Sequence, residues 1–307
     1  MIHIKRFFVN IFDSYIPNKR DNLKSILIKL CFIISLITLI VSSFYIANYI
    51  LEARLQKAVI SNSQEIWYNN DSRDVEHSKA PSRVELMLKE NPDFKGWIKL
   101  SNTQIDNPIF QSEDNQFYLN HNQKKEKSVY GALFFDCNNK ITEEETDKNL
   151  VIFGHEMKNG SMFGELKKLR SLDFYKQNPT IEFSTLYKES VYKIYAVFVL
   201  NASAKDDGGR VYNIYRQNFG NKADFDNWTA EAYSRSLILT DVDVEMGDDI
   251  ITLVTCSSDF ENSRLVVMAR GLREGEAPVV DTSKATVAAN PKYPKIWYEN
   301  KGIKYPF

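Results

Sequence analysis

The chain has 307 residues, of which 43% are hydrophobic and 13% aromatic, enough to bury the core of one sizeable domain. This composition excludes a chain that is disordered throughout. The formal net charge of −1 provides no basic field, and no segment interleaves aromatic residues densely with Lys and Arg, so we exclude a nucleic-acid partner.

Residues 30–51, LCFIISLITLIVSSFYIANYIL, form the first predicted element, a run without a charge. A helix of this length spans roughly 33 Å, just over the roughly 30 Å hydrocarbon layer of a membrane. We predict one transmembrane helix. A cleaved signal peptide is the alternative, but the run exceeds the usual apolar region and YILEARLQKA offers no clear small-residue cleavage site.

Residues 1–29 carry more cations than acids. The cations are Lys5, Arg6, Lys19, Arg20, Lys24 and Lys29, and the acids are Asp13 and Asp21. Under the positive-inside rule this segment lies in the cytoplasm, and everything after residue 51 faces outward. The protein is therefore expected in the cell membrane, with a single pass.

Residues 52–82 are polar and predict a stalk or N-terminal helix that leads to the domain. Ser82 is expected to cap a short helix that Asn91 and Pro92 stop. The domain proper is predicted over 83–273. The extension at 274–307 is richer in Pro, Ala and Lys. It either packs along the domain or makes no stable contact with it.

Short runs rich in Val, Ile, Phe and Tyr recur between turn residues. They cover 96–100, 107–111, 128–136, 149–155, 180–187, 190–200, 249–256 and 264–272. Eight such strands with few helices between them predict a mostly β fold, a closed or nearly closed barrel. Peripheral helices are expected at 161–170, capped by Ser161, and at 222–239, behind an Asp cap.

The three cysteines have different surroundings. Cys31 lies in the membrane run, whereas Cys137 and Cys256 follow it. Two scattered external thiols do not resemble a disulfide framework, although a Cys137 to Cys256 bridge is an alternative. A free external thiol is better explained by chemistry, and a thiol attacks as its thiolate, which needs neighbours that favour ionisation.

The four histidines can be sorted by position. His3 falls in the cytoplasmic segment and His77 in the stalk, which leaves His121 and His155. His155 ends a strongly apolar strand in LVIFGHEMKNG, a place where a scaffold presents a side chain at a rim. We expect His155 to be the partner of the thiol.

Arg264 opens the strand that follows Cys256. If the two strands are neighbours, Cys256 and Arg264 lie side by side. The guanidinium of Arg264 presents its N–H donors in a fixed planar arrangement, which suits the binding of an oxyanion. Taken singly, a strand-end Cys is most often a buried small residue, and the histidine and arginine are most often solvated. Asp259 and Glu261 could orient His155, pair with Arg264 or remain solvated in the loop.

Three separated segments carry a resemblance to a known family. TLVTC followed by SRLVVMAR resembles the T-L-x-T-C and following Arg of sortases. NLVIFGHEMKNGSMFGELKKL is similar to the histidine segment of class B sortases. NPDFKGWIKLSNTQIDNPIFQ and DNQFYLNH are similar to the early strands of that class, and a helix at 222–239 fits its long loop. The resemblance covers roughly residues 83–273.

Sortases are membrane-anchored cysteine transpeptidases of Gram-positive bacteria, built on an eight-stranded barrel. By position, the resemblance implies that Cys256 is the nucleophile, His155 the acid and base, and Arg264 the group that holds the oxyanion or substrate. Asn115 and Leu119 match positions that line the peptide groove, and Thr255 contributes backbone there. Val254 departs from the small polar residue often found at its position in this class, so one hydrogen bond to substrate is in doubt.

The resemblance also implies the reaction. The thiolate attacks the Thr carbonyl of a C-terminal sorting signal, N-P-x-T-x-like rather than L-P-x-T-G, and a peptidoglycan amine resolves the acyl-enzyme. No cofactor is implied, and the dispersed His and Cys lack the spacing of zinc ligands. Two alternatives are a membrane-tethered binding module of the same fold and a hydrolytic cysteine protease. Whether the resting Cys and His pair is ionised is left open.

Overall fold

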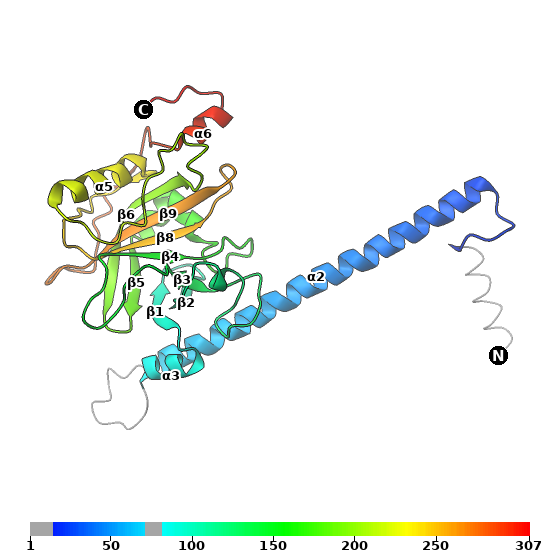
Figure 1. Cartoon of the computed structure of the whole chain (residues 1–307), viewed down its shortest axis with the longest axis horizontal. Helices are drawn as coiled ribbons and strands as arrows, with labels where there is room; N and C mark the ends of the chain where they lie inside the picture. The colour runs from blue at the N-terminus through cyan, green and yellow to red at the C-terminus, as the bar shows by residue number, and fades with distance from the viewer. Residues whose placement is uncertain (1–14, 71–81) are drawn as a thin grey trace. The chain divides into compact units, whose positions relative to one another are not determined.

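The computed structural model describes residues 15–70 and 82–307 (Figure 1). The chain divides into two compact units between Ala58 and Val59. The first contains most of helix α2 (Leu23–Asn69), which Asn22 caps by accepting the N–H of Ser25 at 2.9 Å. By length and composition α2 could cross a membrane, and most apolar side chains in its part before Ala58 are exposed.

Helix α2 is longer than the span predicted over 30–51, because it continues through the first part of the predicted stalk to Asn69. Residues 71–81, the rest of that stalk apart from Asn70 and Ser82, lie outside the described residues, as do His3 and His77. Helix α3 (Arg83–Glu90) starts where predicted. Ser82 accepts the N–H of Glu85 and the Glu85 carboxylate accepts the N–H of Ser82, a reciprocal capping box.

The second unit is built on a closed barrel with strand order β1-β2-β3-β4-β8-β9-β6-β5 (Figure 1). Its strands are β1 (Phe94–Lys99), β2 (Asp106–Phe110), β3 (Leu133–Phe135), β4 (Asn149–Phe153), β5 (Thr180–Thr185), β6 (Glu189–Asn201), β8 (Ile250–Cys256) and β9 (Ser263–Gly271). Each strand overlaps one predicted run, so the mostly β, eight-stranded closed barrel is confirmed.

Strand β3 is much shorter than the run at 128–136 that predicted it. Gly131 has φ +59, and a side chain there would lie 2.4 Å from the carbonyl oxygen of Tyr118. Residues 128–131 therefore form a turn, closed by a bond from the N–H of Gly131 to the carbonyl of Ser128. Helix η2 (Phe117–Leu119) lies across this turn, since the N–H of Ala132 donates to Tyr118.

Strand β8 is buried on both faces, which explains its unbroken apolar sequence. Ile251 and Leu253 join the cluster inside the barrel. Ile250 and Val254 point to the other face, into a second cluster that includes side chains of helix α5 (Lys222–Arg235). The alternation fixes which residues of β8 reach the outer surface.

Helix α5 confirms the helix predicted at 222–239 and its start, but corrects its cap and its C-terminal end. Its cap is Asn221, which accepts the N–H of Asp224 at 2.9 Å, and not an aspartate. The helix ends at Arg235 because the Ser236 hydroxyl accepts the N–H of Val197 on β6 and donates to Ile238. These bonds draw the chain into strand β7 (Ile238–Leu239).

The helix predicted over 161–170 and capped by Ser161 is wrong in its start. Met162 has φ +54, and the N–H of Gly164 bonds back to Ser161, so this part is a turn. Only η3 (Leu166–Arg170) is helical, and its N-terminal residue Glu165 makes no side-chain cap. Helix α4 (Leu172–Gln177), which follows directly, was not predicted.

The C-terminal extension is packed on the domain, which settles the alternative left open by its composition. Strand β10 (Thr286–Val287) pairs with β7 in a two-stranded sheet that was not predicted. Glu276 receives bonds from Arg270 and Lys193. Helix α6 (Lys295–Asn300) follows near the C-terminus (Figure 1).

Asn149 offers a test of this architecture. Its side chain is 0% exposed, its amide donates to the carbonyls of Ile214 and Arg216, and its oxygen accepts the hydroxyl of Thr252 at 2.7 Å. At about 1 kcal/mol per bond, Asn149→Ala should lower the free energy of unfolding by about 3 kcal/mol. Chemical denaturation of the full-length chain in detergent, followed by tryptophan fluorescence, measures this loss.

The matched control is Asn227→Ala on the exposed side of α5, where the change should stay within about 0.5 kcal/mol. Equal losses for the two variants would show that the buried amide does not hold these segments together.

Candidate active site

Three neighbouring strands bring the candidate residues to one end of the barrel. Strand β4 pairs with β8 in parallel, up to Phe153 opposite Val254. Extending this register by two residues puts His155 level with Cys256. Strand β9 pairs with β8 on its other side, with Arg264 opposite Cys256. The three positions therefore form one row across β4, β8 and β9.

Cys256 and Arg264 form the last pair of their ladder. The N–H of Ser257 donates to the carbonyl of Ser263 at 3.1 Å, which makes 257 and 263 a hydrogen-bonded pair. The pair before it is then of the non-hydrogen-bonded kind, with Cα atoms about 4.5 Å apart and side chains on one face. Cys256 is exposed and its thiol is free. The guanidinium of Arg264 donates through Nη1 to Ser263 at 2.9 Å.

Hydrogen bonds to β8 continue past the last residue of β4 and position the chain up to His155. The N–H of Gly154 donates to Val254, and the hydroxyl of Thr255 donates to the carbonyl of Gly154 at 2.7 Å. A side chain at position 154 would collide with Leu133 and with the ring of Phe163, so glycine permits this close approach. The chain thus stays alongside β8 as far as His155.

The ring of His155 is held by the backbone. Its Nε2 atom lies 2.7 Å from the carbonyl oxygen of Leu119 in η2. A carbonyl oxygen only accepts, so we assign the hydrogen to Nε2, which leaves Nδ1 for proton transfer. The ring is half-buried. The carbonyl of His155 in turn accepts the N–H of Phe163 at 3.0 Å.

The three candidate substrate-binding residues lie in different settings. Thr255 is 2% exposed and its hydroxyl is engaged by Gly154, so it can offer only backbone. Asn115 accepts the N–H of Cys137 at 2.8 Å through its side-chain oxygen. Leu119 is half-buried and presents its carbonyl to His155.

The ion-pair partner of Asp259 is neither His155 nor Arg264, the two partners considered from sequence. It forms a two-bond ion pair with Arg170, at 2.9 and 2.8 Å, and accepts the hydroxyl of Ser257. Burial raises the pKa of the Asp259 carboxyl, but the bonds from Arg170 and Ser257 outweigh it and hold the pKa below its ordinary value. Glu261 is exposed. Arg170 had no sequence signal, because its partner is 89 residues away.

The other cysteine and histidine of the domain, Cys137 and His121, have contacts that indicate structural roles. His121 stacks on Phe117 with ring centroids 4.2 Å apart, and its Nδ1 lies 2.8 Å from the carbonyl oxygen of the same residue. Cys137 is a free thiol, so the disulfide alternative with Cys256 is not formed. Burial raises the pKa of the Cys137 thiol, and Asp136 adds to this.

Tyr215 is a neighbour of the row that sequence reasoning missed. Its ring packs near that of Phe153, with centroids 6.1 Å apart. Burial and Asp136 raise the pKa of the Tyr215 hydroxyl, while the guanidinium of Arg264 opposes the rise. An exposed aromatic in a long crossover carries no pattern that marks it in advance.

A small cavity of about 40 Å³ adjoins the thiol position, and its lining includes Thr255, Cys256, Ser257, Glu156 and Arg170. Among the described residues, no group of three or more His, Cys, Asp or Glu side chains could hold a metal ion.

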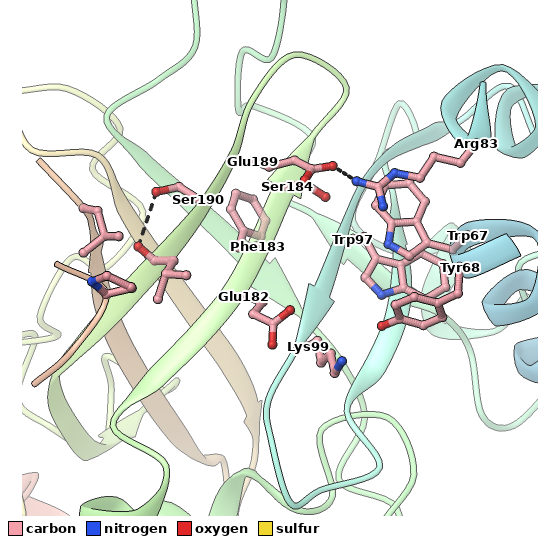
Figure 2. Close-up of a pocket in the computed structure, with 13 residues that line it drawn as sticks. Trp67, Tyr68, Arg83, Trp97, Lys99, Glu182, Phe183, Ser184, Glu189 and Ser190 are labelled. Carbon is pink, nitrogen blue, oxygen red and sulfur yellow. Dashed lines mark hydrogen bonds and ion pairs between the residues drawn. The ribbon is translucent and has the colours of Figure 1, made fainter. Parts of the chain in front are cut away.

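A larger hollow of about 440 Å³ is lined by residues of α2, β1, β5 and β6. Figure 2 shows Arg83 bonded there to Glu189, with the guanidinium also over the ring of Trp67. In the barrel order, β1 and β5 are opposite β4 and β8, and the lining contains no cysteine or histidine. This hollow is therefore separate from the row that carries the thiol.

Comparison with known proteins shows the family to which this fold belongs. The Sortase domain family matches residues 98–271. Sortase B of Listeria monocytogenes is 29% identical over 250 residues, which is 81% of this chain and 98% of that protein. A mutant form of Clostridium perfringens sortase B is 33% identical with a TM-score of 0.61, covering 70% of this chain and 97% of that one.

A Staphylococcus aureus sortase B–substrate complex has a TM-score of 0.63 at 27% identity, and covers 73% of this chain and 99% of that one. The family match spans more than half of the chain, and these relatives share both its barrel and its class. The chain belongs to the sortase family of cysteine transpeptidases, in its class B.

Proposed function

We propose that Cys256 is the nucleophile of this transpeptidase, His155 its acid and base, and Arg264 the residue that stabilises the oxyanion. The observation that carries the proposal is the row itself: an exposed free thiol at the end of β8, level with His155 on one side and paired with Arg264 on the other. No other described cysteine has a histidine and an arginine at matching positions.

In the first half-reaction the proton of the Cys256 thiol passes to Nδ1 of His155, and the resulting thiolate adds to the carbonyl carbon of a threonine in the peptide. The C–N bond then breaks, a thioester forms, and His155 gives its Nδ1 proton to the departing amine. In the second half-reaction a peptidoglycan amine attacks the thioester. His155 takes the proton of the amine, a new amide forms, and Cys256 is released.

Arg264 suits the tetrahedral intermediate because its donors are fixed in a plane. Nη1 is bonded to the carbonyl of Ser263, which orients the guanidinium along the strand end. The remaining N–H groups are available to the oxygen that becomes negative in the transition state. Donors placed in this way stabilise the developing charge without reorganising.

The substrate is a C-terminal sorting signal, N-P-x-T-x-like, on a surface protein. Leu119 and Asn115 line its groove beside His155, and the backbone of Thr255 contributes a strand edge. The structure of a Staphylococcus aureus sortase B–substrate complex supports a peptide at this fold. Val254 is buried on the outer face of β8, so no side-chain hydrogen bond to the peptide arises there.

The enzyme acts at the cell membrane. Sortases are membrane-associated, and α2 supplies a candidate span. We place residues 30–51 in the bilayer, 1–29 in the cytoplasm and 52–82 in a stalk, with the catalytic domain at 83–273 outside and an extension at 274–307. The cations before the span support this orientation.

The decisive experiment offers the full-length chain in detergent a labelled N-P-x-T-x peptide, with and without a wall-peptide amine. We expect amine-dependent product and a thioester on Cys256 that mass spectrometry detects. Cys256→Ala should abolish both while the circular dichroism spectrum is unchanged, because the exposed thiol makes no contribution to the core.

Cleavage that is insensitive to the amine would indicate a hydrolytic protease, and binding without reaction would indicate a recognition module. Activity retained by Cys256→Ala would remove the proposed nucleophile.

Arg264→Lys tests the role of the planar guanidinium donors. Lysine keeps the charge but cannot present two fixed donors, so kcat should fall well beyond tenfold, on the scale seen when an oxyanion donor is removed. Steady-state kinetics with the same peptide measures it. Near-normal kcat in this variant would assign Arg264 a structural role.

The two histidines of the domain should respond differently. His155→Ala should remove nearly all turnover, since it deletes the proton carrier. His121→Ala should retain most of it, because His121 only stacks on Phe117. Single-turnover acylation rates of the two variants compare them directly, and the opposite order would mean that His121 is the catalytic base.

A further inference from the structure

Arg170 joins the two segments that carry the proposed nucleophile and base. It ends η3, which follows His155 in the chain, and it binds Asp259 in the loop that follows Cys256. Both guanidinium Nη atoms are used, one for each carboxylate oxygen. The ion pair therefore ties the chain after His155 to the chain after Cys256.

Asp259 passes this restraint to the nucleophile through short local bonds. Its carboxylate accepts the hydroxyl of Ser257, the residue next to Cys256. Ser263 holds the other end of the loop, because its hydroxyl is 2.7 Å from the carbonyl oxygens of both Ser257 and Phe260. A loop fastened at both ends fixes the direction in which β8 and β9 present their final side chains.

The Arg170–Asp259 ion pair is partly shielded from solvent. The side chain of Asp259 is 12% exposed and that of Arg170 is 33% exposed. Planar, two-bond pairs of this kind are more specific in geometry than single contacts with lysine. Arg170 also lines the small cavity that adjoins Cys256, so the restraint acts next to the thiol.

We propose that Arg170 is a positioning residue for the transfer reaction: through Asp259 it sets the Cys256 loop against the His155 segment. The proposal rests on the function proposed above, since it assumes that Cys256 and His155 react together.

The chain contains a matched control for the Arg170 pair. Arg273 binds Asp248 through two bonds, at 2.9 and 2.8 Å, and is also 33% exposed. That pair joins the segment just before β8 to the segment just after β9, at the end of the β8–β9 hairpin opposite Cys256. Arg273→Gln also removes the bond from Nη1 to Asp243, so it disrupts at least as many ion pairs as Arg170→Gln, but at the other end of the hairpin.

In the full-length enzyme, Arg170→Gln should lower kcat about tenfold or more while KM stays within about twofold, because misplacement of reacting groups slows chemistry more than binding. Arg273→Gln should leave both constants within about twofold, whatever its effect on melting temperature. Arg170→Lys should recover only part of the rate. The double variant Arg170→Gln/Asp259→Asn should be no slower than Arg170→Gln alone, since the two residues act as one unit.

Equal kcat for Arg170→Gln and Arg273→Gln would overturn the positioning role. Failure of the unaltered enzyme to form a thioester on Cys256 would instead contradict the proposed function.

Discussion

The register of β8 between its two neighbours is the constraint on which the site depends. Parallel pairing with β4 sets the level of His155, and antiparallel pairing with β9 sets the level of Arg264. Because side chains alternate along a strand, a slip of one residue would turn Cys256 toward the barrel interior and bring Thr255 to the outer face. The chemistry proposed for the three residues requires one register only.

Several features far from the thiol hold that register. Leu253 packs inside the barrel and Val254 against the outer cluster, so either direction of slip would exchange residues of different shape between two filled cores. At the start of the ladder, the hydroxyl of Thr252 donates to the buried amide oxygen of Asn149. This bond crosses from β8 to β4 and would be lost in any other alignment.

Local signals in the sequence were enough for much of the fold. Short apolar runs marked all eight barrel strands, the candidate cap Ser82 marked α3, and the short separation of β8 and β9 made the pairing of Cys256 with Arg264 predictable as a hairpin. The level of His155 was not predictable in this way. It depends on parallel pairing between strands about a hundred residues apart, and only the family resemblance indicated it.

The features that were missed have the same cause. The end of α5, the pairing of β7 with β10 and the partnership of Arg170 with Asp259 all depend on contacts between distant segments. Nothing in the sequence around Asp259 distinguishes an ion pair with Arg170 from one with Arg264. Such contacts become visible only when the barrel has brought its strand ends together.

The position of the thiol also explains why distant contacts matter here. Cys256 is the last residue of β8, and its side chain is exposed although the strand before it is buried on both faces. Exposure makes the sulfur accessible to a peptide, but it removes the close packing that holds a buried side chain in place. The backbone on either side must then supply the restraint: Thr255 through its bond to Gly154, and Ser257 through Asp259. A nucleophile at the open end of a barrel strand is positioned by its neighbours in the chain, and they in turn are held by residues from elsewhere in the fold.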